Sequence, residues 1–126
     1  VAEFIGSPAM NFVEASRTGA NELQAHGLGL ALTPAQQQAL ESHGSGAVSY
    51  GLRPEALQFA NEGLPGELGM VEPTGPETYA LVDTPLGRLT ARVPGKVHQR
   101  VGERVHLAWS PEHCHLFDGQ TQQRIA

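Results

Sequence analysis

The sequence predicts an all-β protein, folded as a small barrel or sandwich with one short surface helix. Short stretches of alternating apolar and polar residues recur along the 126-residue chain, and this period of two is typical of strands with one buried face. Fifteen glycines and nine prolines are scattered through the chain without a repeat. This composition indicates many short strands joined by tight turns.

The first half is expected to contain three strands. Residues 11–15 form the first expected strand, and the polar stretch 16–21 forms a turn. The other two strands show alternating apolar side chains. These side chains are Leu28, Leu30 and Leu32 in one strand and Val48, Tyr50 and Leu52 in the next.

The clearest helix signal lies between those last two strands. Thr33 is a good N-cap, Pro34 follows where proline is tolerated, and Gln36 can reach back to close a capping box. We expect the helix to end at Gly44, because glycine readily adopts the backbone conformation that terminates helices. Its side chains are mostly polar, so the helix should lie on the surface.

The second half repeats the pattern of strands and turns more regularly. A turn is expected at 61–66, which also offers a soft boundary between two β lobes within a single domain, residues 1–126. A strand over 79–83 and a turn over 84–87 should follow. Two further strands should direct apolar side chains inward, namely Leu89, Ala91 and Val93 in one and Val105, Leu107 and Trp109 in the other.

The composition argues against several classes of protein. The net charge of −5 repels phosphate backbones, so nucleic acid is not an expected partner. No apolar stretch approaches the roughly 20 residues that span a bilayer. The single cysteine, Cys114, cannot form an internal disulfide, which favours a cytoplasmic protein. The chain begins at Val1 inside an apolar phrase, and we expect it to be a fragment of a longer protein.

The motifs that mark common catalytic sites are missing from the sequence. The pair Gly95-Lys96 is followed by Val97 and lacks the first glycine and the hydroxyl residue of a phosphate-binding P-loop. This chain alone is therefore not expected to hydrolyse ATP. Glu72 and Glu77 bracket a turn, and without a sign of an enclosing pocket they are expected to be surface charges.

Two other clusters each have a functional and a structural interpretation. The His-Cys-His segment 113–115, with His106 nearby, could hold one edge of a metal ion or activate its thiol, but a structural zinc site needs four ligands. The structural alternative is a pair of surface histidines flanking a buried cysteine. The Arg-Pro-Glu segment 53–55 could bind an anion or a partner, or could form a turn stabilised by an Arg–Glu pair or a helix cap.

Four phrases, in order along nearly the whole chain, resemble segments of one protein family. They are VAEFIGSPAMNFVEA, YGLRPEAL, VEPTGPET and PEHCHLFDGQTQQRI. Similar phrases follow the nucleotide-binding domain in the ATP-binding subunits of ABC importers of the maltose and glycerol-3-phosphate type. The resemblance implies a transport-associated OB-type (TOBE) regulatory domain, which is all-β and built as a small OB-like barrel or as tandem OB-like lobes.

The residues that match the motifs of this family are implied to have structural or regulatory roles, and none is implied to be catalytic or to bind metal. They are Phe4, Gly6, Ser7, Pro8, Met10, Asn11, Phe12, Gly51, Arg53, Pro54, Glu55, Glu72, Gly75, Glu77, Thr78, His115, Leu116, Phe117 and Asp118. Two positions depart from the family pattern. Thr74 stands where an apolar residue is usual, and Gln122 replaces the usual glycine.

The resemblance also implies a function. The chain would be a regulatory and dimerisation domain, without a cofactor of its own, and ATP and Mg²⁺ would bind to an ATPase domain outside it. The expected partners are a second copy of the subunit, membrane permease subunits, and a regulatory protein or small effector, at the inner face of the cell membrane. The solute would be a sugar, a polyol or glycerol-3-phosphate. The alternative is a stand-alone small-molecule or oxyanion-binding module of the same fold.

Overall fold

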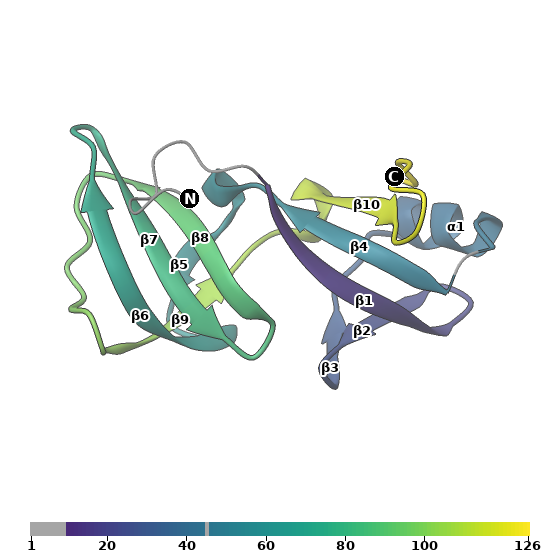
Figure 1. Cartoon of the computed structure of the whole chain (residues 1–126), viewed down its shortest axis with the longest axis horizontal. Helices are drawn as coiled ribbons and strands as arrows, with labels where there is room; N and C mark the ends of the chain where they lie inside the picture. Colours follow the sequence, from purple (N-terminus) through teal and green to yellow (C-terminus); the bar gives the residue numbers. More distant parts are fainter. Residues whose placement is uncertain (1–9, 45) are drawn as a thin grey trace. The chain divides into compact units, whose positions relative to one another are not determined.

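The computed structural model describes residues 10–44 and 46–126 of the chain. Within these ranges the protein is mainly β-structure with a single α-helix, as the sequence predicts. Figure 1 shows the strands gathered into two sheets. Four of the motif residues, Phe4, Gly6, Ser7 and Pro8, lie outside the described residues.

The chain forms two compact units and passes between them three times. The first unit comprises Arg53–Trp109 together with Asn11, and the second comprises Phe12–Leu52 and Ser110–Ala126. The soft boundary near 61–66 is therefore misplaced, because those residues lie inside the first unit. The second unit is discontinuous in sequence, since its last strand comes from the C-terminal end of the chain.

The second unit is a five-stranded antiparallel sheet with a helix. Its strand order is β10-β4-β1-β2-β3, with β1 (Asn11–Gly19), β2 (Glu22–Ala25), β3 (Leu28–Leu30), β4 (Ala47–Leu52) and β10 (Cys114–Asp118). The expected turn over 16–21 is wrong at its start. Strand β1 continues to Gly19 because Ser16 and Arg17 pair with Gln24 and Leu23 of β2.

Helix α1 (Pro34–Ser42) begins as predicted. The backbone N–H of Gln36 donates to Thr33 Oγ1 at 3.1 Å, and Thr33 N–H donates to Gln36 Oε1 at 2.8 Å, which completes the capping box. The Gln36 amide also donates to the carbonyl oxygens of Pro111 and Cys114. The helix stops at Ser42, one residue before a cap at His43.

The first unit is a second five-stranded antiparallel sheet. Its strand order is β5-β9-β6-β7-β8, with β5 (Gln58–Ala60), β6 (Leu64–Pro73), β7 (Glu77–Thr84), β8 (Gly87–Pro94) and β9 (Arg104–Ala108). The turn expected at 61–66 occupies only its first three residues, because β6 begins at Leu64. The expected strands at 79–83 and 88–93 and the turn between them are confirmed.

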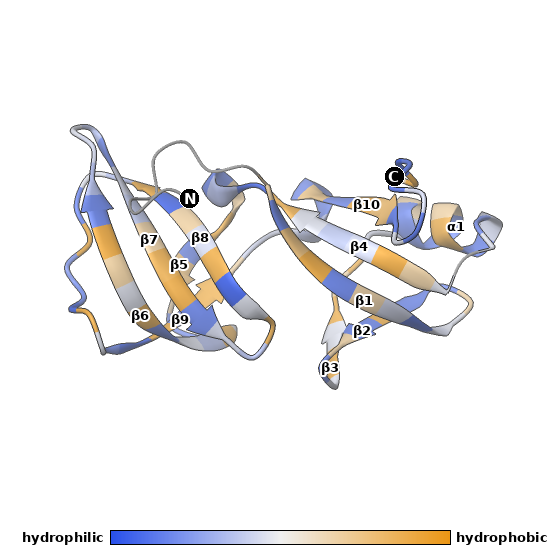
Figure 2. Cartoon of the chain, in the orientation of Figure 1, coloured by the Kyte–Doolittle hydropathy of each residue, from blue (hydrophilic) through white to orange (hydrophobic). Residues whose placement is uncertain are grey.

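Each unit has its own core. Leu68, Val82 and Leu107 are completely buried in the first, and Leu40, Tyr50 and Leu116 in the second. Figure 2 shows orange and blue residues alternating along the strands, as sheets with one buried face require. No helix in the described part of the chain has the length and hydrophobicity to cross a membrane.

Candidate functional site

Several motif residues make hydrogen bonds or ion pairs within the chain, and these contacts account for the type of side chain at each position. Asn11 Nδ2 donates to the carbonyl oxygen of Thr90 at 2.9 Å, and Thr90 N–H donates to Asn11 Oδ1 at 2.8 Å. The side-chain amide thus makes the pair of hydrogen bonds that a neighbouring strand would make with β8. Asn11 satisfies backbone groups of β8, and its position is structural.

The third motif builds the hairpin between β6 and β7. Gly75 has φ +103°, a conformation that favours glycine. Thr78 is almost fully buried and donates its hydroxyl hydrogen to the carbonyl oxygen of Gly95 at 2.6 Å. Thr74, which departs from the family pattern, donates from both its backbone N–H and its hydroxyl to the carbonyl oxygen of Glu77. The departure therefore adds a hydrogen bond to this turn.

Glu55 and Glu77, from two different motifs, meet at one arginine. Arg92 of β8 lies 3.3 Å from Glu77 (Nε to Oε2) and 3.8 Å from Glu55 (Nη2 to Oε1). The Arg–Glu pair considered for the segment 53–55 is therefore made with Arg92. Sequence reasoning did not single out Arg92, because no local pattern links it to two distant glutamates.

The last motif forms a turn around Asp118. Its Oδ1 accepts from the backbone N–H groups of Thr121 at 2.8 Å and Gln120 at 2.7 Å, and its Oδ2 lies 2.5 Å from His43 Nε2. The two backbone hydrogen bonds have the largest effect, and the contact with His43 adds to it. Together they hold the pKa of Asp118 well below its usual range. Gln122 has φ +65°, so the position where the family has glycine keeps a left-handed backbone.

Asp118 should make folding stability depend on pH. Because its pKa is lower in the folded chain than in the unfolded one, its contribution is complete above the unfolded value of about 4 and is lost as the pH falls toward the folded value. We expect the urea midpoint of the wild-type chain to fall more than that of Asp118→Asn between about pH 5 and pH 2. Equal pH dependence of the two midpoints, measured by circular dichroism, would contradict this role.

The His-Cys-His segment does not form a metal site in the described structure. His113 ends the short 3-10 turn Pro111–His113, whereas Cys114 is the first residue of β10 and is buried. Burial raises the pKa of the Cys114 thiol, which disfavours a reactive thiolate. Among the described residues no three His, Cys, Asp or Glu side chains are grouped as metal ligands would be.

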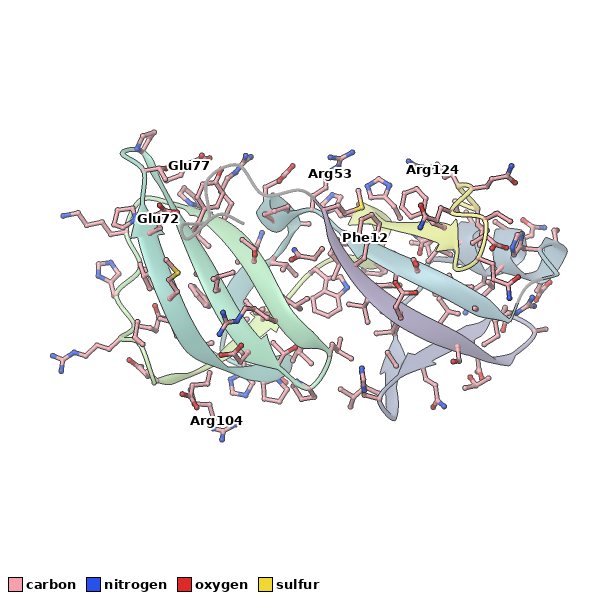
Figure 3. All side chains as sticks on the ribbon, viewed as in Figure 1. Phe12, Arg53, Glu72, Glu77, Arg104 and Arg124 are labelled. Atoms are coloured by element: carbon pink, nitrogen blue, oxygen red, sulfur yellow. The ribbon has the colours of Figure 1, made fainter. Side chains whose placement is uncertain are left out.

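The other motif residues that the structure describes occupy varied places. Leu116 is fully buried, Gly51 and Pro54 are buried, Met10 and Glu72 are partly buried, and Arg53 is exposed. Figure 3 shows Glu72 and Glu77 at the same end of the hairpin, and Arg104 at the other end of that sheet.

An aromatic pair remains on the solvent-facing side of the sheet in the second unit. Phe12 of β1 is 53% exposed although it is a large apolar residue. Its ring packs edge-to-face on the half-buried Phe117 of β10, with 5.7 Å between ring centroids and 72° between planes. Arg124 lies over the Phe117 ring at 5.8 Å, within cation–π range. Figure 3 labels Phe12 and Arg124 in this unit.

Charged side chains flank the aromatic pair on opposite sides. Phe117 pairs with Ser49 of β4, and the Ser49 hydroxyl donates to the carboxylate of Glu14 on β1. The backbone of Arg124, in the C-terminal segment, forms an isolated antiparallel β-bridge with Phe117. We call this surface, formed by Phe12, Glu14, Ser49, Phe117 and Arg124, the aromatic face.

The aromatic face is hollowed between its aromatic and charged side chains. It contains a hollow of about 260 Å³, which Phe12, Phe117, Glu14, Ser49 and Gln122 line. Exposed aromatic residues with charges at their rim are typical of protein interfaces. Sequence reasoning identified Phe12 and Phe117 but missed Glu14, although Glu14 stands two residues from Phe12 and must share its side of the strand.

The two antiparallel β units define an all-β domain, and the comparisons with known proteins identify its family. A model of the TOBE domain matches residues 50–117, and a model of the MalK OB fold domain matches residues 6–57. The chain belongs to the TOBE domain family. These matches confirm the family that the four motif phrases indicated and the predicted all-β, OB-like fold class.

Similar curated proteins are ATP-binding subunits of transporters. The chain is 40% identical to an uncharacterized ABC transporter ATP-binding protein of Sinorhizobium fredii, over 100% of the chain and 34% of that protein. It is 35% identical to the sn-glycerol-3-phosphate import ATP-binding protein UgpC of Chromobacterium violaceum, over 99% of the chain and 34% of that protein. The chain spans about a third of the length of these relatives.

A solved structure has a similar fold. The cytoplasmic molybdate-binding protein ModG, with molybdate bound, superposes with a TM-score of 0.65 at 13% sequence identity. The match covers 84% of this chain and 94% of that one. At this identity the likeness establishes the arrangement of strands alone.

Proposed function

We propose that the chain is the regulatory and dimerisation domain of the ATP-binding subunit of an ABC importer. The observation that carries the proposal is the similarity along the whole chain to proteins named as ATP-binding subunits for import, including one for sn-glycerol-3-phosphate and one, in Streptococcus mutans, for multiple sugars. The solute is then a sugar, a polyol or glycerol-3-phosphate. ATP and Mg²⁺ bind to the remaining two-thirds of such a subunit.

The aromatic face supports the dimerisation role. A two-fold axis brings the same surface of two copies together, so the surface must be complementary to itself. Here Glu14 and Arg124 lie on opposite sides of an apolar centre. A two-fold axis that passes through Phe117 in the plane of the interface, at right angles to the line from Glu14 to Arg124, opposes each glutamate to the arginine of the other copy. The apolar centre supplies affinity and the charged rim supplies orientation.

This arrangement gives the domain a mechanical role. Two subunits that stay joined through their regulatory domains keep their ATPase domains at high effective concentration while these open and close on nucleotide. A regulatory protein or small effector that favours one geometry of the dimer would change transport by shifting that population. The membrane permease subunits would contact the ATPase domain, so the complex would work at the inner face of the membrane.

The coding sequence upstream of Val1 tests the proposal. We expect it to continue without a stop for a few hundred codons and to encode a P-loop, the phosphate-binding signature of an ATPase. The alternative is a stand-alone module that binds an oxyanion, a role suggested only by the fold shared with ModG. A start codon directly before Val1, together with a rise in melting temperature on adding molybdate, would support that alternative and overturn the first proposal.

A further inference from the structure

The first unit contains a cleft that lies outside the aromatic face, and one motif residue, Glu55, lines it. It has a volume of about 530 Å³, within the range typical of small-ligand sites. One wall is β5, and the other is the end of β8 with the loop that follows it. All its lining residues lie within the first unit.

The side chains of the cleft combine three kinds of chemistry. Phe59 provides a half-buried aromatic surface, the amides of Gln58 and Gln99 provide donors and acceptors, and Arg92, Lys96 and His98 provide nitrogen donors. Lys96 is the only lysine in a chain whose net charge is −5. Glu55 also lines the cleft and is paired with Arg92, so Lys96 is the cation of the cleft that has no carboxylate partner among the described residues.

The cleft is held in shape by the contacts around it. Glu55 and Glu77 both pair with Arg92, which ties the end of β8 to the segment that precedes β5. The loop that carries Lys96 and His98 is tied at its start, where Gly95 N–H donates to the carbonyl oxygen of Pro76 at 2.8 Å. A site whose donors are fixed in advance loses less conformational entropy when a ligand binds.

We propose that this cleft binds a small phosphomonoester of a sugar or polyol. The phosphate contacts His98 and Lys96, a charged donor of the kind that makes the strongest hydrogen bonds, while Arg92 stays paired with Glu55 and Glu77. The hydroxyl groups contact Gln58 and Gln99, and the carbon face of the ligand covers Phe59. The inference does not depend on the transport proposal, because every residue it uses lies in this chain.

The single lysine makes the test specific. The purified chain is treated with a limiting amine-acylating reagent, with and without glucose 6-phosphate, and acylation of Lys96 is followed by peptide mass spectrometry. We expect saturating ligand to slow acylation of Lys96 about fivefold or more, since a bound phosphate covers the amine. Glucose and inorganic phosphate, each alone, should protect it less. Equal protection by inorganic phosphate would overturn the organic part of the proposal, and no protection would overturn the site.

Two substitutions distinguish a specific binding site from nonspecific attraction of the anion to positive charge. By calorimetric titration, Lys96→Gln should weaken glucose 6-phosphate binding about tenfold, the loss expected for one charge-assisted hydrogen bond. Arg104→Gln is the matched control, because it removes the same charge from the same unit outside the cleft. Equal weakening by the two substitutions would show that the anion responds to net charge alone, and would contradict the proposal.

Discussion

Replacing Phe117 by serine is expected to weaken self-association of the full-length protein about a hundredfold, as the loss of a central aromatic residue does in many interfaces. Phe117 lies at the centre of the aromatic face, packed against Phe12 and beneath Arg124. Truncation removes the apolar surface and the stacking partner of Phe12 together. The dissociation constant of the dimer, measured by sedimentation equilibrium, is the quantity that should change.

The matched control is Val101→Ser. Val101 is 63% exposed and is the most exposed of the large apolar residues that the structure describes, but it belongs to the first unit and is not part of the aromatic face. This substitution should leave the dissociation constant unchanged. If both variants weaken the dimer equally, general surface hydrophobicity drives association, and the assignment of the aromatic face is wrong. Circular dichroism of each variant checks that folding is retained.

Replacing Gly66 by alanine should lower the free energy of unfolding by about 2–4 kcal/mol, the cost of forcing a methyl group into a packed site. A Cβ atom at Gly66 of β6 would lie 2.6 Å from Val82 Cγ1 and 2.8 Å from the carbonyl oxygen of Asp83. The backbone oxygen cannot move away without disturbing the pairing of β7 with β6. Urea unfolding of the chain measures the effect.

Gly29→Ala is the comparison for this change. Gly29 is also a strand glycine, in β3, but nothing lies within 4 Å of a Cβ atom built there. The substitution should be neutral or slightly stabilising, because alanine loses less conformational freedom than glycine on folding. If Gly66→Ala lowered the free energy of unfolding no more than Gly29→Ala does, the described close approach of β6 and β7 at Gly66 would be contradicted.

Local signals predicted those elements that local interactions determine. Helix α1 began where expected because the capping box of Thr33 and Gln36 is complete within four residues. Strand β6 was largely missed because its first residues, Leu64-Pro65-Gly66, have the composition of a turn. In the structure Gly66 serves the close approach of two strands instead.

The division into units could not be predicted from composition. It depends on the pairing of β10 with β4, which joins Cys114 to Leu52 and Asp118 to Val48 across about half the chain. Neither strand is distinguished from its neighbours by its local pattern. The predicted boundary at 61–66 followed glycine and proline content, which here marks only a turn between β5 and β6.

The motif phrases located important residues without separating their roles. Asn11 and Phe12 are adjacent in one phrase, yet Asn11 hydrogen-bonds to β8 and Phe12 faces solvent. Their side chains point to opposite faces because strands alternate. Arg92, which joins two motif glutamates, belongs to no phrase, and three-dimensional contacts were needed to find it.

The most direct test of the dimerisation role is a charge exchange on the aromatic face. Glu14→Arg and Arg124→Glu are made singly and together in the full-length protein, and dimer dissociation is measured for each. Because a two-fold axis opposes Glu14 to Arg124 of the second copy, each single variant places like charges together and should weaken the dimer. The double variant should restore most of the affinity. A double variant weaker than both single variants would contradict a self-complementary face and the dimerisation role assigned to it.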